Sequence, residues 1–177
     1  MTRRILRKGL ASWRRLATWL MVAAMVAPSG AIAQQGVLAR QIVGTWEIVS
    51  VDIASADGTH VQPFGPKPNG IIMLDASGRY ANVFGSPDRP KIRADNRLAI
   101  TAEQFGAAAK EFAANFGRWS VAETDRTITL QFEGSLDPNN EGARATYSLA
   151  LAGDDMKFSI TLPGQRVEVV EYRRPGR

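Results

Sequence analysis

From residue 42 onward, hydrophobic and polar residues alternate with a period of two along most of the chain. Such alternation is typical of β-strands that bury one face. It predicts eight strands, at residues 42–52, 71–75, 79–84, 118–122, 127–133, 145–151, 156–162 and 167–173. Most are joined by short turn sequences such as Asp75-Ala76-Ser77-Gly78 and Pro163-Gly164. Closure of the sheet satisfies such a series best, because a closed sheet has no exposed edge. We therefore expect an all-β fold, an eight-stranded antiparallel up-and-down β-barrel.

The alternation also predicts which side chains face the barrel interior. Three strands have the apolar sets Ile128, Leu130 and Phe132, then Tyr147, Leu149 and Leu151, then Met156, Phe158, Ile160 and Leu162. The first and third strands have the mixed sets Trp46, Ile48 and Ser50, and Tyr80, Asn82 and Phe84. In the last strand, Val167, Val169 and Val170 break the alternation and leave the inward face unassigned. The interior should thus be mainly apolar with a few polar groups.

One long interruption separates the third and fourth strands. Residues 85–96 are rich in proline and charge and predict a surface loop, after which Thr101 and Gln104 have the spacing of a capping box. Phe105, Ala109, Phe112 and Phe116 then recur at helical spacing and predict a helix over residues 102–116. Because long loops on rigid barrels often carry binding machinery, we expect this segment to control access to the interior, capped by the three phenylalanines. The alternative is a helix that packs on the outer wall.

The first 33 residues differ in character from the rest. They hold six of the 22 Lys and Arg residues and none of the 17 Asp and Glu residues, and an apolar run follows at residues 16–27. The small-residue segment after it ends in Ala31-Ile32-Ala33. This order is typical of a cleavable signal peptide, and the run is too short for a membrane span of about 20 residues. We expect cleavage before Gln34 and a periplasmic or secreted protein with no stable membrane insertion.

Two details complete the domain organisation. Arg3-Arg4 leaves both the general secretory and the twin-arginine export route open. Residues 34–41 are polar without periodicity and are expected to be an N-terminal tether, so the barrel domain should span residues 42–174.

The charge balance disfavours nucleic acid as a partner. The whole chain has a net charge of +5, but without residues 1–33 the remainder has one more acidic than basic residue. Binding to phosphates depends on several Lys or Arg side chains that neutralise them, and no basic stripe remains for this. The chain also has no cysteine, so it forms no disulfide and offers no site for a lipid anchor on a cysteine.

The sequence offers little for catalysis or metal binding. Its single histidine, His60, lies beside Asp57 in the first loop, where a histidine is usually solvated. One histidine, no cysteine and scattered carboxylates give no metal-ligand spacing, and no phosphate-binding loop or nucleophile elbow is present. We assign no catalytic residue, metal or cofactor, and incline to a non-enzymatic function.

Several sequence segments resemble a known family. Gly44-Thr45-Trp46 resembles the Gly-x-Trp signature of lipocalins, in which an arginine of the last strand, here Arg173 or Arg174, packs over the tryptophan. Further matching segments are Val43-Gly44-Thr45-Trp46-Glu47-Ile48-Val49-Ser50, Asp57-Gly58-Thr59, Pro63-Phe64-Gly65-Pro66, Gly70-Ile71-Ile72-Met73, Gly78-Arg79-Tyr80, Phe116-Gly117-Arg118-Trp119, Glu133-Gly134-Ser135-Leu136-Asp137-Pro138-Asn139, Arg144 and Glu171-Tyr172-Arg173. The chain is similar in these to the bacterial and fungal lipocalin-like domain family, a calycin-type group. Some members carry histidines where this chain has Leu130 and Gln131.

The resemblance and the barrel together suggest three functions. The first is binding of a small hydrophobic or amphipathic ligand, and the expected ligand-binding residues are Ser50, Tyr80, Asn82, Phe84, Trp119, Leu130, Phe132, Tyr147 and Phe158. Gly44, Trp46 and Arg173 are expected to be structural. The second is an isomerase or cyclase, which requires a carboxylate or histidine inside the barrel. The third is a packed barrel that acts as an envelope or interaction protein, in which aromatic side chains fill the interior.

Overall fold

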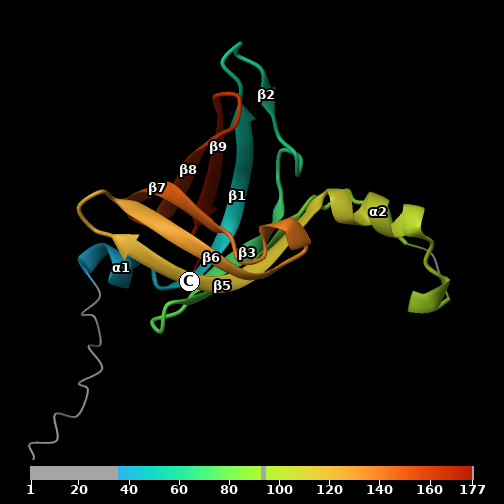
Figure 1. Ribbon diagram of the computed structural model, residues 1–177, viewed down its shortest axis with the longest axis horizontal. Coiled ribbons are helices and arrows are strands. Elements are labelled where there is room, and N and C mark those ends of the chain that lie inside the picture. The colour runs from blue at the N-terminus through green and yellow to red at the C-terminus, as the bar shows by residue number, and fades with distance from the viewer. Residues whose placement is uncertain (1–35, 93–94, 177) are drawn as a thin grey trace, which may run out of the picture. The chain divides into compact units, whose positions relative to one another are not determined.

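The computed structural model describes residues 36–92 and 95–176, and within them nine strands form one antiparallel sheet (Figure 1). The strands are β1 (Gly44–Ala54), β2 (His60–Val61), β3 (Asn69–Leu74), β4 (Arg79–Gly85), β5 (Phe112–Ala122), β6 (Thr127–Ser135), β7 (Arg144–Ala152), β8 (Asp155–Leu162) and β9 (Arg166–Arg173). From β3 to β8, each strand pairs with the next one along the chain, and β1 pairs with both β3 and β9. The sheet is therefore closed, and the predicted eight-stranded up-and-down barrel is confirmed. Strand β2 is an addition that pairs only with the last two residues of β1.

The residues before the barrel form a helix. Residues 37–42, most of which were predicted to belong to a tether, are α1 (Val37–Ile42), and Leu38, Ala39 and Ile42 are buried. The carboxylate of Glu123, just after β5, accepts hydrogen bonds from the amides of Leu38 and Ala39 at 3.0 and 2.9 Å. Because the helix is only six residues long, its periodicity was too short to recognise in the sequence. The predicted signal peptide lies outside the described residues.

The predicted helix between the third and fourth strands exists, but it is shorter than expected. It is α2 (Ala102–Lys110), and Thr101 and Gln104 form the predicted capping box. Phe112 and Phe116, which were expected to continue its apolar stripe, belong to β5 instead. Residues four apart share a face in a strand as well as in a helix, so the spacing of the phenylalanines did not distinguish the two. Two short 3₁₀ helices, η1 (Arg97–Ala99) and η2 (Pro138–Asn140), complete the elements described.

A β-bulge in β1 changes the inward face of that strand. Ile48 pairs with Tyr172, but Ser50 rather than Val49 pairs with Glu171, so one extra residue is inserted in β1. Before the bulge Trp46 and Ile48 are buried, and after it Val51 is buried. The inward set is therefore Trp46, Ile48 and Val51, and the prediction that Ser50 continues it was wrong.

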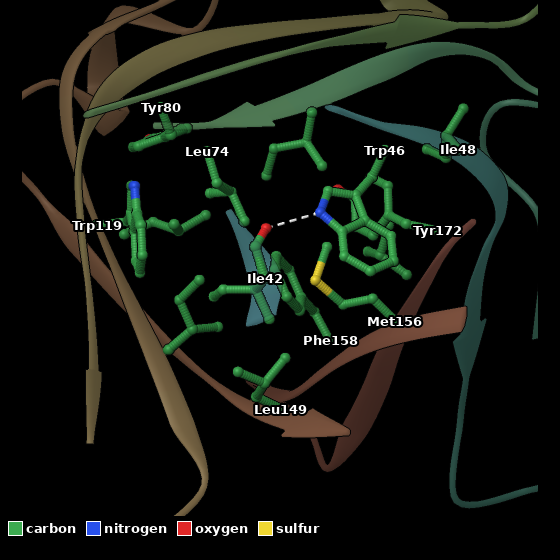
Figure 2. Close-up of a cluster of buried hydrophobic side chains, with 14 of the residues drawn as sticks. Ile42, Trp46, Ile48, Leu74, Tyr80, Trp119, Leu149, Met156, Phe158 and Tyr172 are labelled. Carbon is green, nitrogen blue, oxygen red and sulfur yellow. Dashed lines mark hydrogen bonds between the residues drawn. The ribbon is translucent and has the colours of Figure 1, made fainter. Parts of the chain in front are cut away.

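One end of the barrel, called here the closed end, is filled by side chains around α1. Figure 2 shows Ile42 of α1 lying among Trp46, Leu74, Met156 and Phe158, with the indole Nε1 of Trp46 donating to the Ile42 carbonyl at 2.8 Å. Ile42 and Trp46 are both fully buried. Their burial anchors α1 to the barrel, since each such side chain contributes about 1.5–3 kcal/mol when removed from water.

Candidate ligand-binding site

The other end of the barrel, the open end, contains a cavity of about 200 Å³. Its walls come from β1, from β4 to β9, and from the segments around Phe64 and η2. The lining residues are Val51, Phe64, Asn82, Phe84, Ala113, Asn115, Leu130, Phe132, Asn140, Tyr147, Phe158, Glu168, Val170 and Tyr172. The barrel is thus neither fully packed nor fully hollow.

Six of the nine residues predicted to bind a ligand line this cavity. They are Asn82, Phe84, Leu130, Phe132, Tyr147 and Phe158. Tyr80 and Trp119 do not line it: both are buried, and Nε1 of Trp119 donates to the Asp75 carbonyl at 3.1 Å. Ser50 is absent from the lining because the bulge in β1 places Val51 there instead. The predicted residues that line the cavity lie on strands with regular alternation, whereas in β1 the bulge puts Val51 in the place predicted for Ser50.

Sequence reasoning missed the residues of the cavity that lie on β9 and at the start of β5. Glu168, Val170 and Tyr172 are the inward residues of β9, the strand whose face the sequence left unassigned. Ala113 and Asn115 lie on the part of β5 that was predicted to be helical. In β9, the apolar residues Val170 and Tyr172 are two positions apart and could have indicated the inward face. That choice would also have placed Glu168 inside the barrel.

Three buried polar side-chain atoms have no hydrogen-bond partner among the described residues. They are the side-chain oxygens Oδ1 of Asn82 and Oδ1 of Asn115, and the hydroxyl of Tyr80. Asn82 and Asn115 line the cavity, and Asn82 is only 7 % exposed. A buried polar atom without a partner costs about 1–3 kcal/mol, so such atoms in a cavity are positions where a bound molecule gains affinity.

Burial disfavours the charged forms of the ionisable groups of the cavity. Burial raises the pKa of Glu168 above its usual value. Burial also raises the pKa of Tyr147 to about 12, with a smaller contribution from nearby Glu168. Burial raises the pKa of Tyr172 as well, and neighbouring Tyr147 and Glu168 add to the shift. Both tyrosines are therefore neutral hydroxyls near pH 7, able to donate or accept a hydrogen bond.

Aromatic rings form much of the cavity wall. Phe64 and Phe84 meet edge to face with their ring centroids 4.8 Å apart. Phe158 contacts Tyr147 with the centroids 5.8 Å apart and Tyr172 with the centroids 5.3 Å apart. Such contacts fix ring orientations and contribute roughly 0.5–1.5 kcal/mol each beyond burial. The wall is therefore a set of mutually packed rings, with the polar groups placed between them.

At the closed end, Arg174 is the arginine that packs over Trp46; the sequence left Arg173 and Arg174 open for this contact, and Arg173 was expected to be structural. The guanidinium carbon of Arg174 lies 4.1 Å from the ring centroid of Trp46, whereas Nε of Arg173 pairs with Asp155 at 2.7 Å on the surface. Gly44 fits its predicted structural place: its φ is +132°, and a Cβ there would lie 2.9 Å from Nη1 of Arg174. The closed end thus combines a buried indole, a glycine that permits close approach and a covering arginine.

Two further features bear on partners. The residues that the structure describes contain no group of three or more His, Asp or Glu side chains placed to hold a metal ion. In the same part of the chain, no helix is both long and apolar enough to cross a membrane.

Comparison with known proteins gives a family and structural neighbours. No curated protein matches the chain. A de novo designed fluorescence-activating β-barrel is 17 % identical, with a TM-score of 0.40, covering 77 % of this chain and 96 % of its own. A redesigned β-barrel is 13 % identical, also with a TM-score of 0.40, covering 78 % of this chain and 95 % of its own. The model of the lipocalin-like domain matches residues 43–171. Since this match runs from the residue before Gly44 to Glu171, two residues before the end of β9, the chain belongs to the lipocalin-like domain family.

Proposed function

We propose that this protein binds a small amphipathic molecule in the cavity at the open end of its barrel, and that it does so outside the cytoplasm. The observation that carries the proposal is the pairing of an aromatic wall with buried polar atoms that have no partner, Oδ1 of Asn82 and Oδ1 of Asn115. Apolar walls with a few polar groups are the usual composition of a ligand site.

The size of the cavity limits the ligand. A volume of about 200 Å³ exceeds the roughly 150 Å³ of an engineered cavity that binds benzene. It is smaller than the roughly 300–1,000 Å³ of sites for drug-sized molecules. The ligand should therefore be about the size of one ring with a short polar chain.

A blocked cavity tests the proposal. Ala113 lines the cavity from β5, so Ala113→Phe should place a ring inside it, whereas Ala122→Phe makes the same change at an exposed position of the same strand. We expect native mass spectrometry of protein purified from its own cell envelope to show a retained small molecule in the wild type and in Ala122→Phe, but not in Ala113→Phe. Far-ultraviolet circular dichroism verifies that both variants fold. Retention by Ala113→Phe, or no retained molecule in the wild type, would count against binding in the cavity.

The export part of the proposal rests on residues 1–33. Cleavage before Gln34 would leave α1 whole, because α1 begins at Val37. Sequencing of the N-terminus of the protein from its native source should begin at Gln34. A chain recovered with Met1 intact in the membrane fraction would show that the segment is not a cleaved signal.

A barrel enzyme is the second candidate, and Glu168 is the observation that favours it. A carboxyl group inside the barrel is what acid–base chemistry on a bound molecule requires. Acid–base catalysis usually needs a second group that titrates near the working pH. Tyr147, which interacts with Glu168, has a pKa raised to about 12, so binding is the better-supported function. Release of the retained molecule with an altered mass after incubation, in the wild type but not in Glu168→Gln, would favour the enzyme.

A further inference from the structure

The cavity is rich in hydrogen-bond acceptors and contains no cation. Its polar lining consists of the carboxyl of Glu168, the amides of Asn82, Asn115 and Asn140, and the hydroxyls of Tyr147 and Tyr172. No lysine, arginine or histidine is among the lining residues. The two partnerless atoms of the lining, Oδ1 of Asn82 and Oδ1 of Asn115, are amide oxygens, which only accept hydrogen bonds. A ligand that satisfies this site must bring donors.

We propose that Glu168 selects ligands that carry a protonated amine on a short apolar body, with the carboxylate as the counterion and the side-chain oxygens of Asn82 and Asn115 as further acceptors. The inference rests on the proposed binding function and adds the charge of the ligand to it. The aromatic rings of Tyr147, Phe158 and Tyr172 line the same cavity and favour a cation through their faces.

Other glutamates of the barrel form ion pairs with basic side chains, whereas Glu168 does not in the part of the chain that the structure describes. Three residues along the same strand, Glu171 pairs with Lys157 on β8 at 2.7 Å on the outer surface. Glu133 pairs with Arg79 and Arg118, also outside the cavity. Glu168 faces inward, and no cationic side chain of the described residues forms an ion pair with it. Because an ionised carboxylate that is partly buried without a cation is destabilised, a cationic ligand would gain affinity by pairing with Glu168.

The neighbours of Glu168 in the sheet and in the cavity carry no charge near neutral pH. Its cross-strand neighbours, Ile53 on β1 and Ile160 on β8, are uncharged. The two tyrosines that interact with Glu168, Tyr147 and Tyr172, have raised pKa values and stay neutral up to alkaline pH.

Two basic side chains of this region are exposed and lie outside the lining of the cavity. Arg166, two residues earlier on β9, is exposed and donates to the Pro163 carbonyl. His60, the single histidine, is exposed on β2 and is not a lining residue. Glu168 is thus the one carboxylic acid among the described residues that line the cavity, and burial raises its pKa.

The sign of the pH dependence separates an amine from a neutral ligand. An amine requires ionised Glu168, so its affinity should rise as the pH increases through the raised pKa of Glu168 and hold until the amine deprotonates near pH 10. A neutral alcohol that accepts a hydrogen bond from protonated Glu168 should instead lose affinity over the same rise in pH. The two cases predict opposite slopes.

Calorimetric titration with 2-phenylethylamine and 2-phenylethanol tests the inference on the full exported chain. At pH 8 we expect the amine to bind roughly ten- to a hundredfold more tightly than the alcohol, the range expected for a hydrogen bond to a charged group. Glu168→Gln should abolish this preference and the rise of amine affinity with pH. The matched control Glu171→Gln, on the outer surface of the same strand, should keep both.

The outcomes distinguish this inference from the function on which it rests. Equal affinities for the two compounds, or a preference that survives in Glu168→Gln, would overturn the role of Glu168 while leaving ligand binding intact. If neither compound binds the wild type at millimolar concentration, both the amine preference and the proposed cavity function fail for ligands of this size.

Discussion

The choice between two adjacent arginines is settled by which way each side chain points. Tyr172 faces inward, so Arg173 faces outward, and Arg174 after the end of β9 returns to the closed end, where it lies over Trp46 and donates to the Val43 carbonyl at 3.4 Å. The sequence could not assign this role to Arg174, because three valines in β9 hide the parity of that strand.

Replacing each arginine by alanine should separate their roles. Arg174→Ala removes a cation from the face of a buried indole and should lower the free energy of unfolding by about 0.5–2 kcal/mol. Arg173→Ala removes an exposed ion pair with Asp155 and should lower the free energy of unfolding by less, because water screens an ion pair on the surface. Urea denaturation measures both, and a larger loss for Arg173→Ala would reverse the assignment.

Glu168 should also make stability depend on pH. Burial raises its pKa in the folded state above that in the unfolded chain, so the folded protein holds the proton more tightly. Stability from this group is therefore full below the unfolded pKa and is lost as the pH rises through the folded pKa. Urea unfolding at pH 4 and pH 8 should show Glu168→Gln gaining stability relative to the wild type at the higher pH. A constant difference between the two proteins would show that Glu168 does not titrate on unfolding.

At the scale of elements, the six-residue helix α1 depends on a side chain from another part of the barrel. The Glu123 carboxylate satisfies two amides of its first turn, and its side chain occupies the space beside Gly36, where a Cβ would have to displace it. Glu123→Ala should destabilise the protein by about 0.5–2 kcal/mol, as the loss of a helix cap does. Glu123→Gln keeps one acceptor oxygen and should fall between, as measured by thermal unfolding. No loss in Glu123→Ala would mean that the burial of Ile42 alone holds α1.

Helix α2 is a different case, because it contributes no buried residue. Phe105 is 47 % exposed and Phe116 is 50 % exposed, and α2 projects from the barrel in Figure 1. The expectation that these side chains cap the interior was therefore wrong. Phe105→Ser should change the free energy of unfolding by less than about 0.5 kcal/mol and should leave the exchange rate of a bound apolar fluorescent probe unchanged. Faster probe exchange in this variant would restore the gating role of the helix.

Patterns in the sequence predicted elements well where the strands are regular. The predicted inward sets that begin at Ile128, Tyr147 and Met156 agree with the burial of β6, β7 and β8, because no bulge interrupts the alternation within these sets. The bulge after Ile48 reverses the parity of β1 without any special residue to mark it, since Val49 and Ser50 both suit a strand. A register change of one residue exchanges the two faces, which is why Ser50 was misplaced.

At the scale of the whole barrel, the cavity results from unequal filling of the two ends. The closed end receives side chains from α1 and from the strands, and the open end receives none from α2. The sequence predicted the barrel but not this asymmetry, because α1 was too short to recognise and α2 was expected to cover the opposite end. The inward position of Glu168 was hidden for a related reason: an ionisable residue among valines is normally outward.

The central claim is that the open end of the barrel holds a small molecule, and methyl-resolved NMR tests it most directly. Addition of 2-phenylethylamine should shift the methyl signals of Val51, Leu130 and Val170, which line the cavity, in a saturable manner. The methyl signals of Ile42, Leu74 and Ile128, which fill the closed end, should stay in place. Saturable shifts at the closed end or on the outer surface, with none at Val51, Leu130 and Val170, would contradict the account.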